Sequence, residues 1–145
     1  TIINIEGIDF PIKLHGQVDR VDKLNGVLRI IDYKSGLVQS TDLKVSEMEE
    51  LRSKEQYKAI QVLLYAYLYT SNKTYNFEGP IHAGIYSFKN LKSGFLPVDF
   101  APSRKTPEID ITQEKLDEFI EVLKTYIKEI YSLDHNFIEP VDLKY

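Results

Sequence analysis

Two stretches of the chain carry apolar residues at the spacing of a helix. Lys54–Thr70 combines good helix formers with a broad apolar surface, which predicts a mostly buried helix. Leu116–Tyr131 carries a narrower apolar stripe, which predicts an amphipathic helix covering one face of a sheet. Asp110 or Thr112 is expected to cap this second helix, with Gln113 at the capping-box distance from Asp110.

Five other stretches have the composition or alternation of β-strands. They are Ile2–Ile5, Phe10–Leu24, Val27–Lys34, Ile81–Phe88 and Phe95–Phe100. The resulting order β-β-β-α-β-β-α predicts an α/β fold, with a mixed central β-sheet flanked by helices.

The segments between these elements are mostly polar. Leu37–Lys54 shows weak periodicity and is expected to be a mobile loop or short helix, either a gate over a binding groove or, as we favour, a solvated insertion. Asn72–Pro80 is interpreted as a connector, and Asn136–Tyr145 as a tail. Because no internal repeat or second domain is visible, residues 1–145 are expected to form a single domain.

Asn25-Gly26 lies between two strand-like runs and predicts a β-hairpin with a two-residue type I′ turn. This turn makes Leu24 face Val27 and fixes the register of the whole hairpin. Asp22 then lies opposite Arg29, a partner of opposite charge. Asp22 is therefore interpreted as structural.

The same register brings four polar side chains together on the other face of the hairpin. Asp19 is expected opposite Asp32, and Gln17 opposite Lys34, and directly opposed residues share a face. Gln17 would support this cluster. The simplest alternative is that these charges only pair across an exposed sheet face, as surface charges often do.

Two carboxylates side by side repel each other unless a cation lies between them. A ligand set of oxygens alone favours a hard divalent ion, Mg²⁺ or Mn²⁺, that stays partly hydrated and can take a phosphate oxygen. Lys34 could then orient a water or stabilise charge on the phosphate. The predicted cluster suits phosphodiester hydrolysis.

Gln61 and Tyr65 lie on one face of the first predicted helix, together with Tyr57. Gln61 could bridge a water or phosphate while the Tyr65 hydroxyl fixes it; the alternative is that they belong to a hydrogen-bond network in the core. His15 has the strand parity of Asp19, but a general base needs a specific partner and none is visible, so a structural role is favoured.

Three motifs in order resemble the PD-(D/E)XK nuclease superfamily, and most closely its RecB/AddB-type exonuclease branch. Gly16–Asp22 reads Gly-x-Val-Asp-Arg-Val-Asp, Ile30–Gly36 reads Ile-Ile-Asp-Tyr-Lys-Ser-Gly, and Gln61–Tyr65 reads Gln-x-x-x-Tyr. The resemblance extends over about residues 5 to 140 and implies a restriction-endonuclease-like core.

The resemblance also implies roles for individual residues. Asp19 and Asp32 would bind the metal with help from the main-chain carbonyl of Tyr33, and Lys34 would be catalytic. The two named residues of the Gln-x-x-x-Tyr motif would support the site and contact DNA.

The chain departs from the pattern of the family in two ways. Members usually carry a further acidic or His ligand on a helix before the first strand, and only Glu6 and Asp9 are early acids here. Many AddB-like members hold an iron–sulfur cluster through cysteines, which this chain, with no Cys, cannot do. Both departures lead us to expect a nuclease domain excised from a longer protein, without its first helix.

Composition agrees with one soluble domain, since 145 residues with 43% hydrophobic content can bury a sizeable core. No apolar run is long enough to cross a membrane, no signal peptide is visible, and the absence of Cys fits the cytoplasm. The net charge of −4 is unusual for an autonomous DNA binder and suggests dependence on a partner region. The only locally basic stretch is a candidate contact with the DNA backbone, although exposed lysines in loops are usually just solvated: Lys89, Lys92, Arg104 and Lys105.

These observations predict a Mg²⁺-dependent DNA nuclease, more in the manner of an exonuclease than an endonuclease. It would act in recombination or repair together with a helicase or another DNA-binding region. The main alternative is a nuclease-fold module that binds DNA or assembles a complex without catalysis. A third hypothesis, a protein-interaction domain with incidental motifs, predicts no effect of divalent ions.

Overall fold

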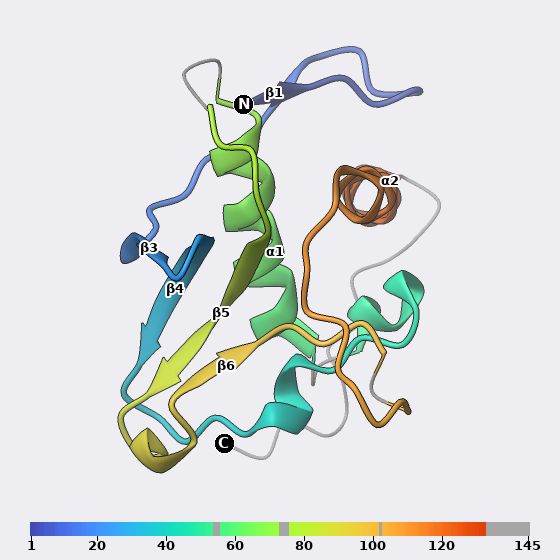
Figure 1. The fold of residues 1–145 in the computed structure, drawn as a ribbon. Coiled ribbons are helices and arrows are strands. Elements are labelled where there is room, and N and C mark those ends of the chain that lie inside the picture. Colours follow the sequence, from blue (N-terminus) through green and yellow to red (C-terminus); the bar gives the residue numbers. More distant parts are fainter. Residues whose placement is uncertain (54–55, 73–75, 102, 133–145) are drawn as a thin grey trace.

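The computed structural model describes residues 1–53, 56–72, 76–101 and 103–132. At its centre is a four-stranded sheet with the order β3-β4-β5-β6 (Figure 1). The strands are β3 (Arg20–Leu24), β4 (Val27–Lys34), β5 (Ile81–Ser87) and β6 (Phe95–Pro97). β4 and β5 are parallel, whereas the two outer pairs are antiparallel. The prediction of a mixed sheet is confirmed.

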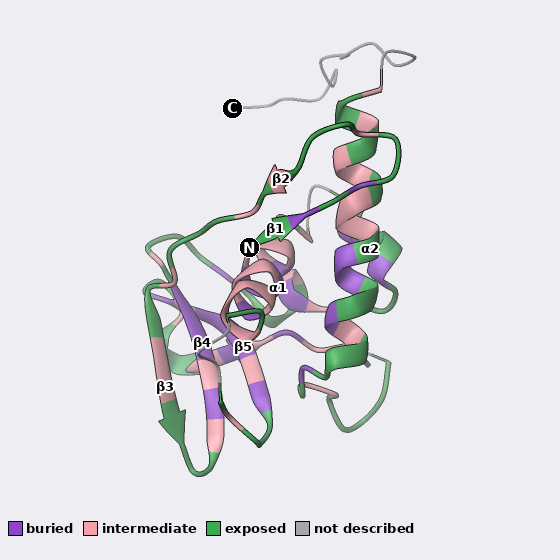
Figure 2. Ribbon diagram, turned by 90° about the horizontal axis from the view of Figure 1, so that it is seen from above, coloured by how far each residue is buried: buried purple, intermediate pink, exposed green. Residues whose placement is uncertain are grey.

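Two helices pack on one side of this sheet. α1 (Tyr57–Thr70) lies between β4 and β5 in the chain and packs on both, as a parallel pair requires a crossover connection. α2 (Gln113–Ile130) packs against α1. In Figure 2 the buried segments lie on β4, β5 and part of α2, whereas β3 is exposed or half-buried. The core therefore lies between the sheet and the two helices.

The hairpin turn is as predicted. Asn25 and Gly26 both have positive φ, 51° and 82°, and Leu24 pairs with Val27. The register continues through Asp22 with Arg29. This part of the fold is specified by local sequence.

The expected strand Phe10–Leu24 is wrong. Only Ile12–Lys13 (β2) is a strand in its first half, and it pairs with Ile2–Ile3 (β1) rather than with the central sheet. The physical reason is visible at Gly16, where a Cβ atom would lie 3.0 Å from the ring of Tyr65. The chain passes closely over α1 at this point, and it joins the sheet only at β3 (Figure 1).

For Leu37–Lys54, of which residues 37–53 are described, the prediction of a short helix is right in kind, but the interpretation as a solvated insertion is wrong. The segment forms two 3-10 helices, η1 (Ser40–Leu43) and η2 (Met48–Arg52). It buries five apolar side chains to 3% exposure or less: Val38, Leu43, Val45, Met48 and Leu51. The spacing of these apolar positions changes along the segment from that of a strand to that of a helix, so no single period in the sequence indicates that it completes the core.

The remaining boundaries differ little from expectation. Thr112 caps α2 by accepting a hydrogen bond from the amide of Lys115, which decides between the two expected caps. β6 ends at Pro97, earlier than predicted; the amide of Val98 still donates to the Ala83 carbonyl, and Asp99 then forms a bridge with Lys44. The expected tail 136–145 lies outside the described residues. Among the helices of the described residues, none is long and apolar enough to cross a membrane.

Candidate active site

β4 places two charged side chains on the buried side of the sheet. Leu28, Ile30, Asp32 and Lys34 alternate with outward-facing residues, so the last two continue an apolar row. Asp32 is only 4% exposed, and the side chain of Lys34 is 28% exposed. A buried carboxylate is costly without partners.

Gln61 of α1 supplies those partners by bridging the two charges. Lys34 Nζ donates to Gln61 Oε1 at 2.6 Å, and Gln61 Nε2 donates to Asp32 Oδ1 at 3.2 Å. Lys34 Nζ also lies 2.9 Å from Asp32 Oδ2. One amide therefore fixes both the carboxylate and the ammonium by its two ends.

Tyr65, one turn further along α1, holds Gln61 in place. Its hydroxyl accepts a hydrogen bond from Gln61 Nε2 at 2.8 Å. Its ring lies against Gly16, where the absence of a side chain allows the close approach. The segment before β3 thus buttresses the Gln-x-x-x-Tyr face from outside.

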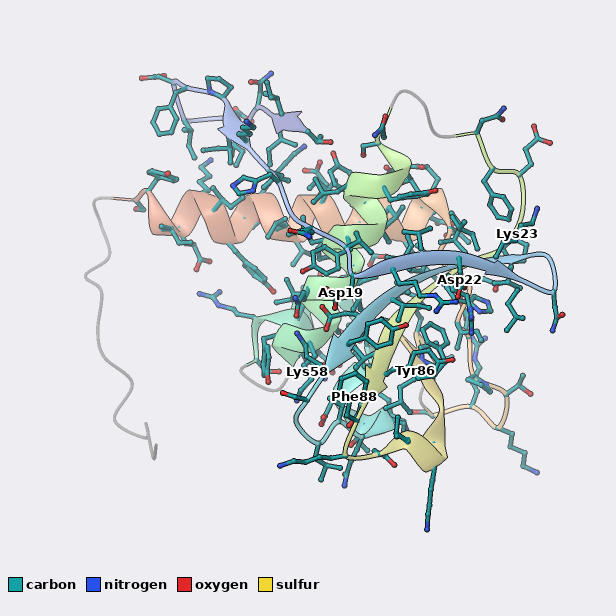
Figure 3. All side chains as sticks on the ribbon, turned by 90° about the vertical axis from the view of Figure 1, so that its left-hand side faces the viewer. Asp19, Asp22, Lys23, Lys58, Tyr86 and Phe88 are labelled. Atoms are coloured by element: carbon teal, nitrogen blue, oxygen red, sulfur yellow. The ribbon has the colours of Figure 1, made fainter. Side chains whose placement is uncertain are left out.

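Asp19 lies at the N-terminal end of β3, next to β4 (Figure 3). It is exposed, and its Oδ2 accepts a hydrogen bond from the main-chain N–H of Tyr33 at 2.8 Å. Tyr33 is the residue between Asp32 and Lys34. Both carboxylates therefore lie at the same end of β4: Asp19 is hydrogen-bonded to the main chain of this strand, and Asp32 is one of its residues.

The donor set fits a hard divalent ion. Asp32 Oδ2 is buried and has no well-formed hydrogen bond to any described residue, although Lys34 Nζ is close to it. The N–H and C=O of a strand residue point to the same edge, so the Tyr33 carbonyl points towards the edge where Asp19 lies. Within the described residues no three acidic, His or Cys side chains form a metal site. Two carboxylates with main-chain and water oxygens are what Mg²⁺ commonly uses.

Other sequence candidates are not brought into this cluster. Gln17 and His15 are exposed, and neither hydrogen-bonds to another described residue. Glu6 lies next to Gly7, which packs near Lys128 of α2, so the hairpin of β1 and β2 is anchored on α2 rather than at the site. The expected pairing of Gln17 with Lys34 is not observed, because the chain joins the central sheet only at Arg20, after Gln17.

Asp22 has the structural role expected for it. Arg29 donates to both of its carboxylate oxygens at 2.8 Å, and Arg20 adds a third contact. The hydrogen bond from Arg29 lowers the pKa of Asp22 below its ordinary value. This carboxylate is fully engaged on the opposite face of the hairpin.

Sequence reasoning missed one cation on the α1 face that carries the network. Lys58 lies one turn before Gln61 and pairs with Asp42 of η1 at 3.1 Å. Burial alone would lower the pKa of Lys58, but its hydrogen bonds to Asp42 and Tyr57 raise it. The i, i+3 spacing to Gln61 was the available signal.

The fold and the cluster at the end of β4 define a class of protein, an α/β protein with a restriction-endonuclease-like core. A family model described as the PD-(D/E)XK nuclease superfamily matches residues 1–139. The chain belongs to the PD-(D/E)XK nuclease superfamily, and this membership indicates a nuclease. No curated protein and no solved structure matches the chain significantly.

Proposed function

We propose that the chain is a divalent-metal-dependent DNA nuclease whose site comprises Asp19, Asp32, Lys34, Gln61 and Tyr65. The observation that supports this most is the bridge from Gln61 to both Asp32 and Lys34. A sheet that needed only a satisfied core would not place a carboxylate and an ammonium at adjacent positions of an apolar row.

Asp32 Oδ2, the carboxylate of Asp19 and the Tyr33 carbonyl are the oxygens that would hold Mg²⁺ or Mn²⁺. When bound, the ion supplies Lewis-acid chemistry, activating water and neutralising charge on the phosphate. The role of the surrounding residues is to keep these oxygens in place before the substrate arrives.

Lys34 neutralises Asp32 in the structure and would have a different task once a divalent ion takes over that charge. Gln61 Oε1 still holds its ammonium, so Lys34 would remain beside the carboxylate and face the phosphate or the attacking water. Gln61 and Tyr65 position Lys34 rather than react.

The type of nuclease, the process in which it acts and its partner are proposed from the sequence. The resemblance of the three motifs supports a RecB/AddB-type exonuclease working in recombination or repair. The net charge of −4 supports dependence on a helicase or another DNA-binding region.

Calorimetric titration with Mn²⁺ tests the metal site without needing DNA. The unmodified chain is expected to bind Mn²⁺ saturably, and Asp32→Asn is expected to lose this binding. Asp22→Asn is the matched control, because it removes a carboxylate from the same hairpin that is already paired with Arg29. Equal binding by all three proteins would overturn the proposed site.

Cleavage assays with Lys34→Ala separate catalysis from metal binding. Removing the ammonium removes a cation that competes for Asp32, so the variant should bind Mn²⁺ at least as tightly as the unmodified chain. It should nevertheless lose DNA cleavage. Retained cleavage would exclude Lys34 from the mechanism, and metal binding without cleavage by the unmodified chain would favour a non-catalytic module.

A further inference from the structure

Three aromatic rings are stacked on the side of the sheet that faces away from α1. Tyr33 lies between Tyr86 and Phe88, with ring centroids 6.0 and 5.9 Å apart and interplanar angles of 25° and 18°. Phe95 continues the row beside Tyr86 at 5.7 Å. We call Tyr33, Tyr86, Phe88 and Phe95 the aromatic face. Figure 3 shows Tyr86 and Phe88 on the viewer's side of the sheet, with the helices behind it.

The aromatic face is open to solvent in the part of the chain that the structure describes. Tyr33 is 36% exposed and Phe88 58% exposed, and the neighbouring Leu91 is 63% exposed. Solvent-facing positions of a sheet are usually polar. An open row of rings instead marks a binding surface.

The charges around the aromatic face suit a polyanion. Arg29 lies 5.6 Å from the ring of Phe95, and Arg20 lies on the same face with its side chain 54% exposed. Lys89 and Lys92 are exposed in the adjoining loop. Asp22 pairs with both arginines, and the two lysines add positive charge in a chain whose net charge is −4.

A hollow on this face has the size and lining for a flat heterocycle. Its volume is about 220 Å³, and it is lined by three rings, one aliphatic side chain and an ion-paired cluster: Tyr33, Tyr86, Phe88, Leu91, Arg20, Asp22 and Arg29. It is smaller than the roughly 300 Å³ at which sites for drug-sized ligands begin. Rings below and a guanidinium beside are the groups that hold an unpaired base.

The aromatic face is directly connected to the candidate site. Tyr33 sends its ring to this face, while its main-chain N–H binds Asp19 and its chain neighbours Asp32 and Lys34 point to the opposite side. The aromatic face and the candidate site therefore lie on opposite sides of β4 at the same end of the strand, and a substrate strand that contacts both would pass around that end.

We propose that the aromatic face binds unpaired nucleotides of the substrate, so that the nuclease acts on single-stranded DNA or on a frayed end. This inference rests on the proposed function. Stacking requires a free base surface, which bases inside a duplex do not offer.

The chain has no Trp, so a single introduced indole reports stacking by its fluorescence. Phe88→Trp places an indole on the aromatic face, and Tyr131→Trp places one at the end of α2, where the native ring is similarly exposed at 53%. Both full-length variants are titrated with (dT)12 and with a 12-base-pair duplex in EDTA at low salt. Binding is thereby measured without metal and without cleavage.

The expected result is that (dT)12 quenches the indole of the Phe88→Trp variant at concentrations where the duplex has little effect, and does not quench the Tyr131→Trp variant. In a competition assay Phe88→Ala should weaken (dT)12 binding about 5- to 150-fold, the range found for loss of one stacking ring. Equal quenching by duplex, equal quenching of the two variants, or none at all would overturn the proposal. So would an emission shift of the Phe88→Trp variant with protein concentration alone, which would assign the face to a second copy of the chain.

Failure of the proposed function would be recognised separately. If (dT)12 quenches the Phe88→Trp variant but the chain cuts no DNA in Mn²⁺, the stacking surface is retained and the nuclease assignment is lost. If the chain cuts DNA and (dT)12 has no effect on the indole at position 88, the nuclease assignment is retained and the stacking surface is lost.

Discussion

Replacing Gln61 by Met removes the bridge of the candidate site while keeping the length of the side chain and its helix propensity. The hydrogen bonds from Lys34, to Asp32 and to Tyr65 are all lost. No cavity of consequence is created, so the change in stability reports the polar network.

The magnitude follows from how accessible each abandoned partner is to water. The side chain of Lys34 is 28% exposed and Tyr65 is half-buried, so water can replace their lost bonds at small cost. Asp32 is 4% exposed, and its Oδ1 would be left without a donor. An unsatisfied buried acceptor costs about 1–3 kcal/mol, so we expect the free energy of unfolding to fall by about 2 kcal/mol.

Urea unfolding followed by circular dichroism measures this change. Gln113→Met is the matched control, because Gln113 lies on α2 and makes one exposed hydrogen bond, to Asp117. Its free energy of unfolding should change by less than about 0.5 kcal/mol.

A double-mutant cycle with Lys34→Met shows whether the two residues act together. Residues in one hydrogen-bond network have coupling energies of about 0.5–3 kcal/mol. If Gln61→Met costs no more than the Gln113 control, and the cycle gives no coupling, then Gln61 does not hold Asp32 and Lys34 in place and the reasoning about the site is wrong.

Gly16→Ala places a methyl group 3.0 Å from the ring of Tyr65 and should lower the free energy of unfolding by about 1 kcal/mol in the same urea assay. Gly36→Ala is the control: its methyl group meets no described atom within 4 Å, so it should be neutral or slightly stabilising. Equal effects would show that Tyr65 yields freely. Asp22→Asn should cost about 1 kcal/mol at pH 7, because Arg29 loses its charged partner. Since the pKa of Asp22 is lowered in the folded state, this stabilisation is present above the unfolded pKa and is lost as the pH falls through the folded value. The difference in stability between the two proteins should therefore shrink as the pH falls below about 4, the ordinary pKa of an Asp carboxyl, and a difference that does not shrink with falling pH would contradict the role of the ion pair.

The parts of the fold predicted from the sequence are those specified by neighbouring residues. The turn at Asn25-Gly26 needs only its own two residues, and it sets the register of the β3–β4 hairpin. The second helix was predicted from its stripe and its cap because both are local. Gln61 and Tyr65 were expected on one helix face, where they lie.

The parts that could not be predicted depend on contacts between distant segments. Nothing near Gly16 in the sequence shows that the ring of Tyr65 occupies the space where a side chain at position 16 would lie, so the predicted strand Phe10–Leu24 is too long. The amide of Gln61 was expected to touch water or phosphate, whereas the structure uses both of its ends within the protein. The exposed rings of Tyr33 and Phe88 stand in the sequence only as part of two ordinary strands.

The parallel pairing of β4 with β5 has a consequence for the order in which the protein folds. Leu28 pairs with Ile81, across the two 3-10 helices and the whole of α1, so loop closure must precede these hydrogen bonds. The hairpin with both carboxylates and the lysine can form early, since its contacts are local. Gln61 reaches Lys34 only when α1 docks, and Ser87 contacts the Gly36 carbonyl and the Val38 amide only when β5 pairs with β4. We therefore expect the residues proposed for chemistry to come together before the contacts that hold them in position are formed.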